Sequence, residues 1–320
     1  MKRYNLPVLA GVLAFGSAVA HASCGSAFCM LNTNWDMQGV VVQPGLRLDL
    51  RYEYIKQDQP MSGTRKLSVG QIPRHHDEVS TANRNLLATA DYTFNERWAV
   101  SATVPYLDRS HLHVHNHRGE QLPEQWDYKQ VGDVRVLGRY QLNSESAQTQ
   151  KLNFYGINFG LKLPTGDKNV VNAAGSRAER TLQPGTGTTD LVLGAFYSQL
   201  LGQSDASWFV QGLWQAPLDS SEDYRPGKRA TLDLGYRYEA TDKVGLMLQL
   251  NTLWRGRDSG AQAEPDDTGG TFVYLSPGAS YAIAKGFQVY GFVQKPIYQY
   301  VNGVQLTARW SGMLGITTRF

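Results

Sequence analysis

The feature that most constrains this chain is a series of long segments in which apolar and polar residues alternate. In residues 46–54 the apolar set is Leu46, Leu48, Leu50, Tyr52 and Tyr54, and the charged set between them is Arg47, Asp49, Arg51 and Glu53. A period of two places the two sets on opposite faces of a β-strand. A single strand of this kind is compatible with a soluble sheet and with a membrane barrel. The arrangement of all the strands is needed to distinguish the two.

Twelve strands of this kind are predicted, and most are longer than the five or six residues usual in soluble domains. Their length suits an oblique crossing of a bilayer, which needs about 9–11 residues. The predicted strands are residues 45–57, 79–94, 98–109, 131–142, 151–165, 189–201, 206–218, 229–240, 243–257, 269–283, 287–298 and 306–320. The final strand is predicted to place Leu306, Ala308, Trp310, Gly312, Leu314, Ile316 and Phe320 on one face.

The connections between these strands alternate in length. Those after even-numbered strands are short, as at residues 95–97 and 241–242, whereas most of those after odd-numbered strands are long, as at residues 58–78 and 110–130. Transmembrane barrels have short periplasmic turns and long extracellular loops. Closure is required because an open sheet edge would leave N–H and C=O groups unsatisfied in hydrocarbon. The sequence therefore predicts an all-β protein, a single closed antiparallel transmembrane β-barrel of about twelve strands, integral to a bacterial outer membrane.

The charged faces of these strands are predicted to line the barrel interior. An outward Arg or Lys at the bilayer midplane would cost roughly 2–4 kcal/mol, which forces these side chains inward. The predicted lumen-lining residues are Arg47, Asp49, Arg51, Glu53, Asp133, Arg135, Arg139, Asp233, Arg237, Glu239 and Arg309. Two interpretations stay open: an ion-pair network that fills the barrel, or a polar, water-filled path.

The N-terminus has the features of a secretory signal peptide. Lys2 and Arg3 precede an apolar run over residues 6–20, which is too short to span a membrane comfortably, and small residues follow it. We therefore divide the chain into a signal peptide at residues 1–22, a periplasmic or plug segment at residues 23–44, and the barrel at residues 45–320.

Two cysteines, Cys24 and Cys29, follow the predicted cleavage site. Export places them in an oxidising compartment, so a local disulfide is expected.

All six histidines after residue 22 fall in two predicted external loops: His75 and His76 in the first, and His111, His113, His115 and His117 in the second. If the third strand continues beyond the membrane, the four alternating histidines share one face and extend the lumen-facing row. Neutral imidazoles at this spacing can coordinate Zn or Cu ions. The alternative is a solvated rim that becomes charged at low pH. No other cofactor is expected.

Several functional classes are disfavoured. The chain has no G-x-S-x-G motif and no carboxylate–histidine spacing of a metalloenzyme, so no enzymatic activity is expected. A net charge of +3 argues against a nucleic-acid partner. A mean hydropathy of −0.38 is too polar for a bundle of transmembrane helices.

One block of motifs carries a family resemblance. The chain reads Leu163-Pro164-Thr165-Gly166-Asp167, then Pro184-Gly185-Thr186-Gly187, then Asp190 followed by Gly194. This arrangement resembles the outer-membrane transporter family named for the meta-pathway of phenol degradation, over roughly residues 131–320. The resemblance implies a barrel that carries hydrophobic compounds across the outer membrane.

The sequence therefore predicts an outer-membrane channel for passive uptake or efflux of small molecules, with hydrophobic or aromatic compounds as the expected solutes. The alternatives are a metal-binding or metal-permeable barrel that uses the His-rich segment, and a non-conducting surface-binding barrel. The expected partners are outer-membrane lipid and a small-molecule solute, and no oligomeric state is predicted.

Overall fold

A computed structural model describes residues 23–24, 31–33, 44–71, 76–117, 120–146, 151–201 and 205–320. The predicted signal peptide, Cys29 and His75 lie outside the described residues. Within these ranges, no helix combines the length and the hydropathy needed to cross a membrane.

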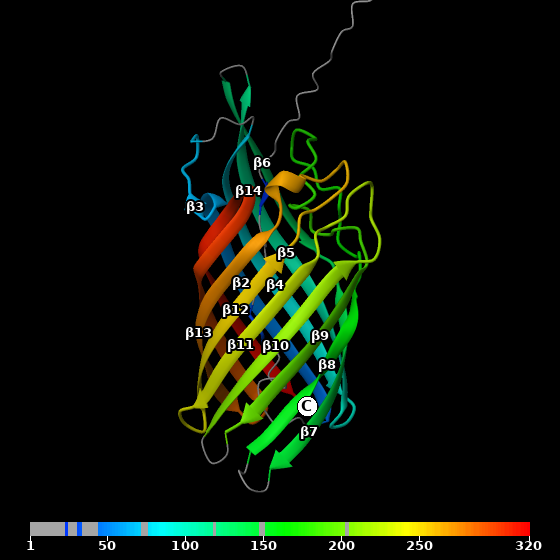
Figure 1. Cartoon of the computed structure of the whole chain (residues 1–320), viewed down its shortest axis with the longest axis vertical. Helices are drawn as coiled ribbons and strands as arrows, with labels where there is room; N and C mark the ends of the chain where they lie inside the picture. Colours follow the sequence, from blue (N-terminus) through cyan, green and yellow to red (C-terminus); the bar gives the residue numbers. More distant parts are fainter. Residues whose placement is uncertain are drawn as a thin grey trace, which may run out of the picture.

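The described strands form one tall barrel whose strands run obliquely around the wall (Figure 1). Neighbouring wall strands pair antiparallel, and the sheet closes where β14 pairs with β2. The wall consists of β2 (Gly45–Gly63), β4 (His76–Thr93), β5 (Trp98–His117), β7 (Arg135–Ser146), β8 (Lys151–Lys162), β9 (Asp190–Leu200), β10 (Ala206–Pro217), β11 (Arg229–Glu239), β12 (Val244–Arg255), β13 (Gly270–Ala284) and β14 (Phe287–Arg319). The predicted closed antiparallel barrel is confirmed.

Strand β14 occupies two positions in this wall. Its part up to Val301 pairs with β13, and its part from Val304 pairs with β2. The chain turns back at Gly303, where φ is 54° and a Cβ would lie 2.1 Å from Asp267 Oδ1. When the two parts are counted separately, the described residues form a wall of twelve segments, as the sequence predicted.

The outer surface of the wall carries an apolar belt. On β11, Leu232 and Leu234 are exposed while Asp233 between them is buried. Tyr92, Phe94 and Trp98 are exposed around the short turn between β4 and β5, at the position where transmembrane barrels carry an aromatic girdle. The side chain of Asn95 forms this turn by accepting hydrogen bonds from the Arg97 and Trp98 amides at 2.9 and 3.0 Å. A closed barrel with such a belt is the architecture of an integral outer-membrane protein.

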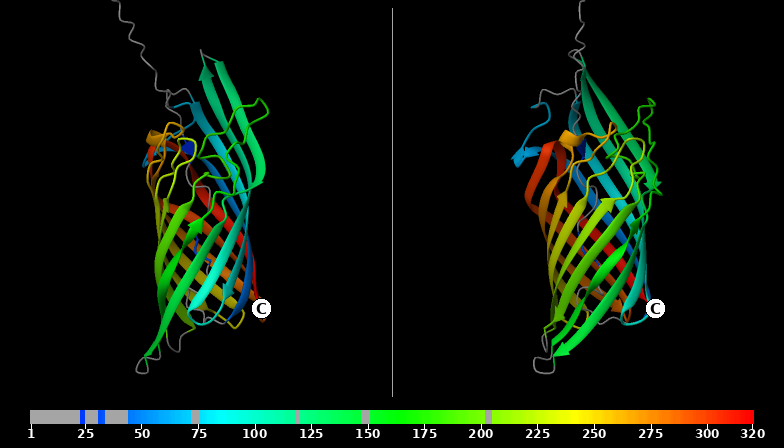
Figure 2. Two further views of the ribbon diagram at one scale, coloured as in Figure 1. Left: turned by 90° about the vertical axis from the view of Figure 1, so that its right-hand side faces the viewer. Right: turned by 45° about the vertical axis from the view of Figure 1, so that its right-hand side comes forward.

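The second long connection differs from the sequence prediction. Residues 110–130 are mostly β-structure, because β5 runs on to His117 and pairs with β6 (Glu120–Val131). This hairpin projects beyond the rim that carries the long loops (Figure 2). Near the membrane β5 pairs with β7 through residues 98–103, and from Tyr106 outward it pairs with β6 instead.

The final strand also differs in part. Its register with β2 shifts on both sides of Ala308, so a bulge interrupts the alternation there. Leu306 and Ala308 are consequently buried, whereas Trp310, Leu314 and Ile316 face outward as predicted.

Candidate permeation pathway

The barrel encloses a cavity of about 370 Å³, a volume within the range of small-molecule sites. It is lined by inward residues of the wall, by residues 180–186 of the loop before β9, by residues 224–227 of the loop before β11 and by residues 31–33. Its cationic lining comprises Arg47, Arg51, Arg109, Arg135, Lys162, Arg180, Arg229 and Arg255. Its acidic lining comprises Asp49, Asp91, Asp133, Asp190 and Asp233. Cationic groups therefore outnumber acidic groups around this space.

Several of the lining charges pair across neighbouring strands. Arg47 on β2 lies 3.5 Å from Asp91 on β4. The Tyr290 hydroxyl of β14 donates to Asp49 Oδ2 at 2.8 Å. These contacts fix the side chains against the wall at one side of the cavity.

Residues 31–33 of the N-terminal segment lie inside the barrel. The backbone N–H of Asn32 donates to Gln249 Oε1 at 3.2 Å, and Gln249 Nε2 donates in return to the backbone carbonyl of Asn32 at 2.8 Å. Arg51 Nη1 donates to Thr33 Oγ1 at 2.6 Å. Leu31 is buried in an apolar cluster with Ile55 and Phe292.

The motifs that carried the family resemblance meet at one carboxylate. Asp133 accepts hydrogen bonds from the Gly166 amide at 3.1 Å, the Thr186 amide at 2.9 Å and Lys162 Nζ at 2.9 Å. Lys162 also lies 3.2 Å from Asp190. Gly166 and Gly185 are in close contact, since a Cβ on Gly166 would lie 2.8 Å from the Gly185 Cα. These glycines are therefore required where loop 163–189 packs against itself.

The same loop reaches over the cavity. Arg109 Nη1 of β5 donates to the Leu182 carbonyl at 2.6 Å. The Arg180 guanidinium lies 4.7 Å from the centre of the Tyr224 ring. Loop 163–189 is thus held from the β5 side and from the loop that follows β10.

The structure places the predicted lumen-lining residues as follows. Arg47, Asp49, Glu53, Arg139, Asp233 and Arg237 are buried within the barrel, and Arg51, Asp133 and Arg135 line the cavity. Glu239 pairs with Arg237 and is partly exposed.

Arg309 does not point inward, and its assignment to the lumen was wrong. The β14 bulge turns Arg309 and Trp310 outward together, so the Arg309 side chain is 62% exposed and lies 3.4 Å from Asp58.

Within the described part of the chain, the predicted histidines lie in strands rather than in loops. His111, His113 and His115 are on β5, with His111 and His113 buried on the inward face. The side chains of His76 and His117 are outside the described part of the chain, as is that of Cys24.

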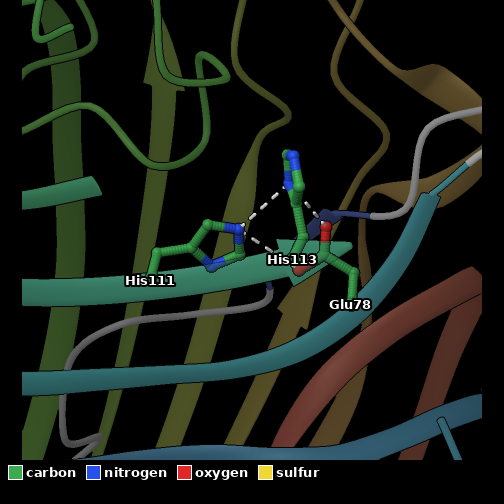
Figure 3. Close-up of side chains that lie close together, drawn as sticks. All are labelled: Glu78, His111 and His113. Atoms are coloured by element: carbon green, nitrogen blue, oxygen red, sulfur yellow. Dashed lines mark hydrogen bonds and ion pairs between the residues drawn. The ribbon is translucent and has the colours of Figure 1, made fainter. Parts of the chain in front are cut away.

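His111 and His113 meet a carboxylate of the neighbouring strand, Glu78 (Figure 3). Burial lowers the pKa of His111 well below its usual value, and His113 and Arg109 add to this effect. Burial, with the carboxylates of Glu179 and Asp267 nearby, raises the pKa of Glu264 to about 10.

Sequence reasoning missed Glu78, Glu124, Arg109, Arg180 and Arg229. Glu78 and Glu124 each pair with His113 across β4 and β6, so strand register was the missing information. Arg109 lies in the same odd-numbered row as the histidines, and that periodicity could have identified it.

Together, a closed barrel with an apolar belt and a charged interior cavity defines the class of outer-membrane channel barrels. The family described as MetA-pathway of phenol degradation matches residues 85–309, and the chain belongs to this family. The match begins before the expected residue 131, so it includes His111 and His113.

Three solved structures show different degrees of similarity to this chain, all at low sequence identity. The COG4313 outer membrane channel from Pseudomonas putida F1 has a TM-score of 0.65 and 13% identity, over 91% of this chain and 100% of that chain. The translocator domain of autotransporter NalP from Neisseria meningitidis has a TM-score of 0.45 and 13% identity, over 87% and 90% of the two chains. The CymD monoaromatic hydrocarbon channel has a TM-score of 0.43 and 12% identity, over 87% and 89%. No curated protein matches the chain.

Proposed function

We propose that this protein is a passive outer-membrane channel for small organic anions, with aromatic carboxylates as the favoured solutes. The observation that carries the proposal is the interior cavity of about 370 Å³, around which arginine and lysine side chains outnumber aspartates. A surplus of fixed positive charge raises the local concentration of anions and repels cations.

The family description supports the aromatic part of the solute class, because it names phenol degradation. The apolar lining residues Leu87, Leu107 and Val192 offer contact to an aromatic ring, while arginines receive a carboxylate. The proposal includes no catalytic step. Loop 163–189 and residues 31–33 narrow the path.

Planar-bilayer recording of the refolded protein tests this function. We expect discrete conductance steps and, across a KCl gradient, a reversal potential of the sign that marks preferred anion permeation. The double variant Arg135→Gln/Arg229→Gln should have an anion-to-cation permeability ratio lower by about twofold or more, because both positive side chains line the cavity. Arg309→Gln is the matched control, since this arginine faces outward and should leave the ratio unchanged.

A liposome-swelling series distinguishes the solute class. Benzoate should enter faster than benzylamine and faster than a sugar of similar size. A folded barrel without conductance steps would indicate the non-conducting surface-binding alternative. Faster entry of the cation would contradict the assigned selectivity.

A further inference from the structure

The outer ends of β4 and β5 bring two imidazoles and a carboxylate together, away from the permeation cavity. His111 Nε2 lies 3.5 Å from His113 Nδ1 and 3.5 Å from Glu78 Oε2, and His113 Nδ1 lies 4.0 Å from Glu78 Oε1. Ligand atoms of a tetrahedral zinc ion with bonds of about 2.0–2.1 Å are about 3.4 Å apart. The three side chains are therefore already close to the spacing that such an ion requires.

The surroundings orient these groups. Thr81 Oγ1 lies 2.8 Å from His111 Nδ1, a contact that leaves Nε2 directed toward His113 and Glu78. Trp126 of β6 packs against His113, with ring centres 4.7 Å apart. Exposure of the residues is 3% for Glu78, 1% for His111 and 3% for His113. The site is buried, and contacts with Thr81 and Trp126 fix the orientation of its histidines.

Two further buried carboxyl groups lie near this cluster: Glu179 is close to Glu78, and Glu264 is close to Glu179. Both carboxyl oxygens of Glu179 are buried and have no hydrogen-bond partner among the described residues. One oxygen of Glu264 is buried in the same way, within the described part of the chain. A buried carboxyl group is offset by a proton or by a cation. At Glu78 the two adjacent imidazole nitrogens make a metal ion the specific choice.

We propose that Glu78, His111 and His113 bind a divalent transition-metal ion of the Zn²⁺ type. Two imidazole nitrogens with one carboxylate oxygen suit Zn²⁺, Cu²⁺ or Ni²⁺, whereas Mg²⁺ and Ca²⁺ require mostly oxygen ligands. The site is a structural element of the extracellular rim and does not depend on the proposed solute selectivity.

A second triad shares one of these histidines. His113 Nε2 and His115 Nε2 lie 3.4 and 3.1 Å from Glu124 Oε2. Because His113 belongs to both triads, and the first triad is the more deeply buried, we expect one ion per chain at Glu78, His111 and His113.

The ion would act on the loop that covers the cavity. Trp126 packs with Ala178 and Leu182 of loop 163–189, and its Nε1 donates to the Ser176 carbonyl at 2.9 Å. An ion that holds the outer ends of β4 and β5 together would therefore also stabilise the surface against which loop 163–189 packs.

Calorimetric titration of the refolded, tag-free protein with ZnCl₂ tests the site. We expect one ion per chain with micromolar or tighter affinity, and no heat with MgCl₂. The His111→Gln/His113→Gln variant should bind Zn²⁺ at least tenfold more weakly. Co²⁺ should give the visible absorption bands of a tetrahedral site in the unmodified protein and lose them in this variant.

The matched control is His115→Gln/Glu124→Gln, which removes the second triad and should keep Zn²⁺ binding within about twofold. The heat-dependent gel mobility of each variant verifies that the barrel is folded. If the folded protein binds no Zn²⁺, or if the control variant loses binding while the first variant retains it, the assignment is overturned. Conductance in the absence of metal is measured separately, so failure of this site and failure of the channel are distinguishable.

Discussion

At the scale of single residues, Asp133 connects segments that are far apart in the sequence. Its carboxylate receives Lys162 from the end of β8 and backbone amides of Gly166 and Thr186 from both ends of loop 163–189. A charged acceptor with several donors is worth more than a neutral one, and its loss leaves the buried Lys162 with less compensation. The family motif therefore supplies backbone amides that donate hydrogen bonds to the Asp133 carboxylate.

Replacing Asp133→Asn should lower the free energy of unfolding by roughly 2–3 kcal/mol, because the amide keeps the shape but removes the charge opposite Lys162. Urea unfolding in lipid vesicles measures this change. Asp127→Asn is the matched control, since Asp127 is exposed on β6 and should change the unfolding free energy by less than about 0.5 kcal/mol. An equal loss of unfolding free energy in the two variants would contradict the role assigned to Asp133.

At the scale of elements, strict alternation made most strands predictable. On β2, Leu48, Leu50 and Tyr52 face outward and the charged residues between them face inward, as the pattern predicted. On β14 the same rule failed at Arg309, because a bulge adds residues that the partner strand does not match. A bulge depends on pairing with β2, which residue types do not reveal.

The sequence did not predict the β5–β6 hairpin either, because this hairpin also depends on strand pairing. Residues 120–131 include Pro123 and several charged residues, and Glu124 interrupts the apolar row of Leu122, Trp126 and Tyr128, so the segment resembles a loop. Pairing with β5 and burial of Trp126 and Tyr128 against loop 163–189 make them a strand. The contact of Glu124 with His113 depends on this pairing, and the contact of Glu78 with His113 depends on the pairing of β4 with β5. Residue types alone reveal neither register, which explains why the histidines could be selected from the sequence and these glutamates could not.

The belt gives an element-scale prediction on β11. Leu234 lies in the outward row with 46% exposure, so Leu234→Arg should destabilise the inserted barrel by roughly 2–4 kcal/mol. Leu218→Arg is the control, because Leu218 is 57% exposed in the loop after β10 and should tolerate the charge. Urea titration of both variants in vesicles measures the difference. A similar loss for Leu218→Arg would indicate that the exposed leucines do not mark the lipid contact.

At the scale of the whole molecule, the interior combines a fixed wall with two inserted pieces. Residues 31–33 contact β2, β10 and β12 from within, and loop 163–189 covers the other side of the cavity. The wall follows from closure of alternating strands, which the sequence reveals directly. The inserted pieces depend on polar contacts between distant residues, such as Asn32 with Gln249, and these have no periodicity to reveal them.

If the N-terminal segment restricts the path, weakening its contacts should widen the channel. We expect Leu31→Ala/Asn32→Ala/Thr33→Ala to increase single-channel conductance by about twofold or more, because it removes the side chains through which these residues contact Gln211, Arg51 and the cluster around Ile55. The free energy of unfolding should change much less than for Leu234→Arg, since the barrel wall is untouched. Planar-bilayer recording measures the conductance, with Val69→Ala in the external loop between β2 and β4 as the control. An unchanged conductance in the folded triple variant would place the narrowest point of the path at loop 163–189, and Asp133→Asn would then be expected to produce the increase.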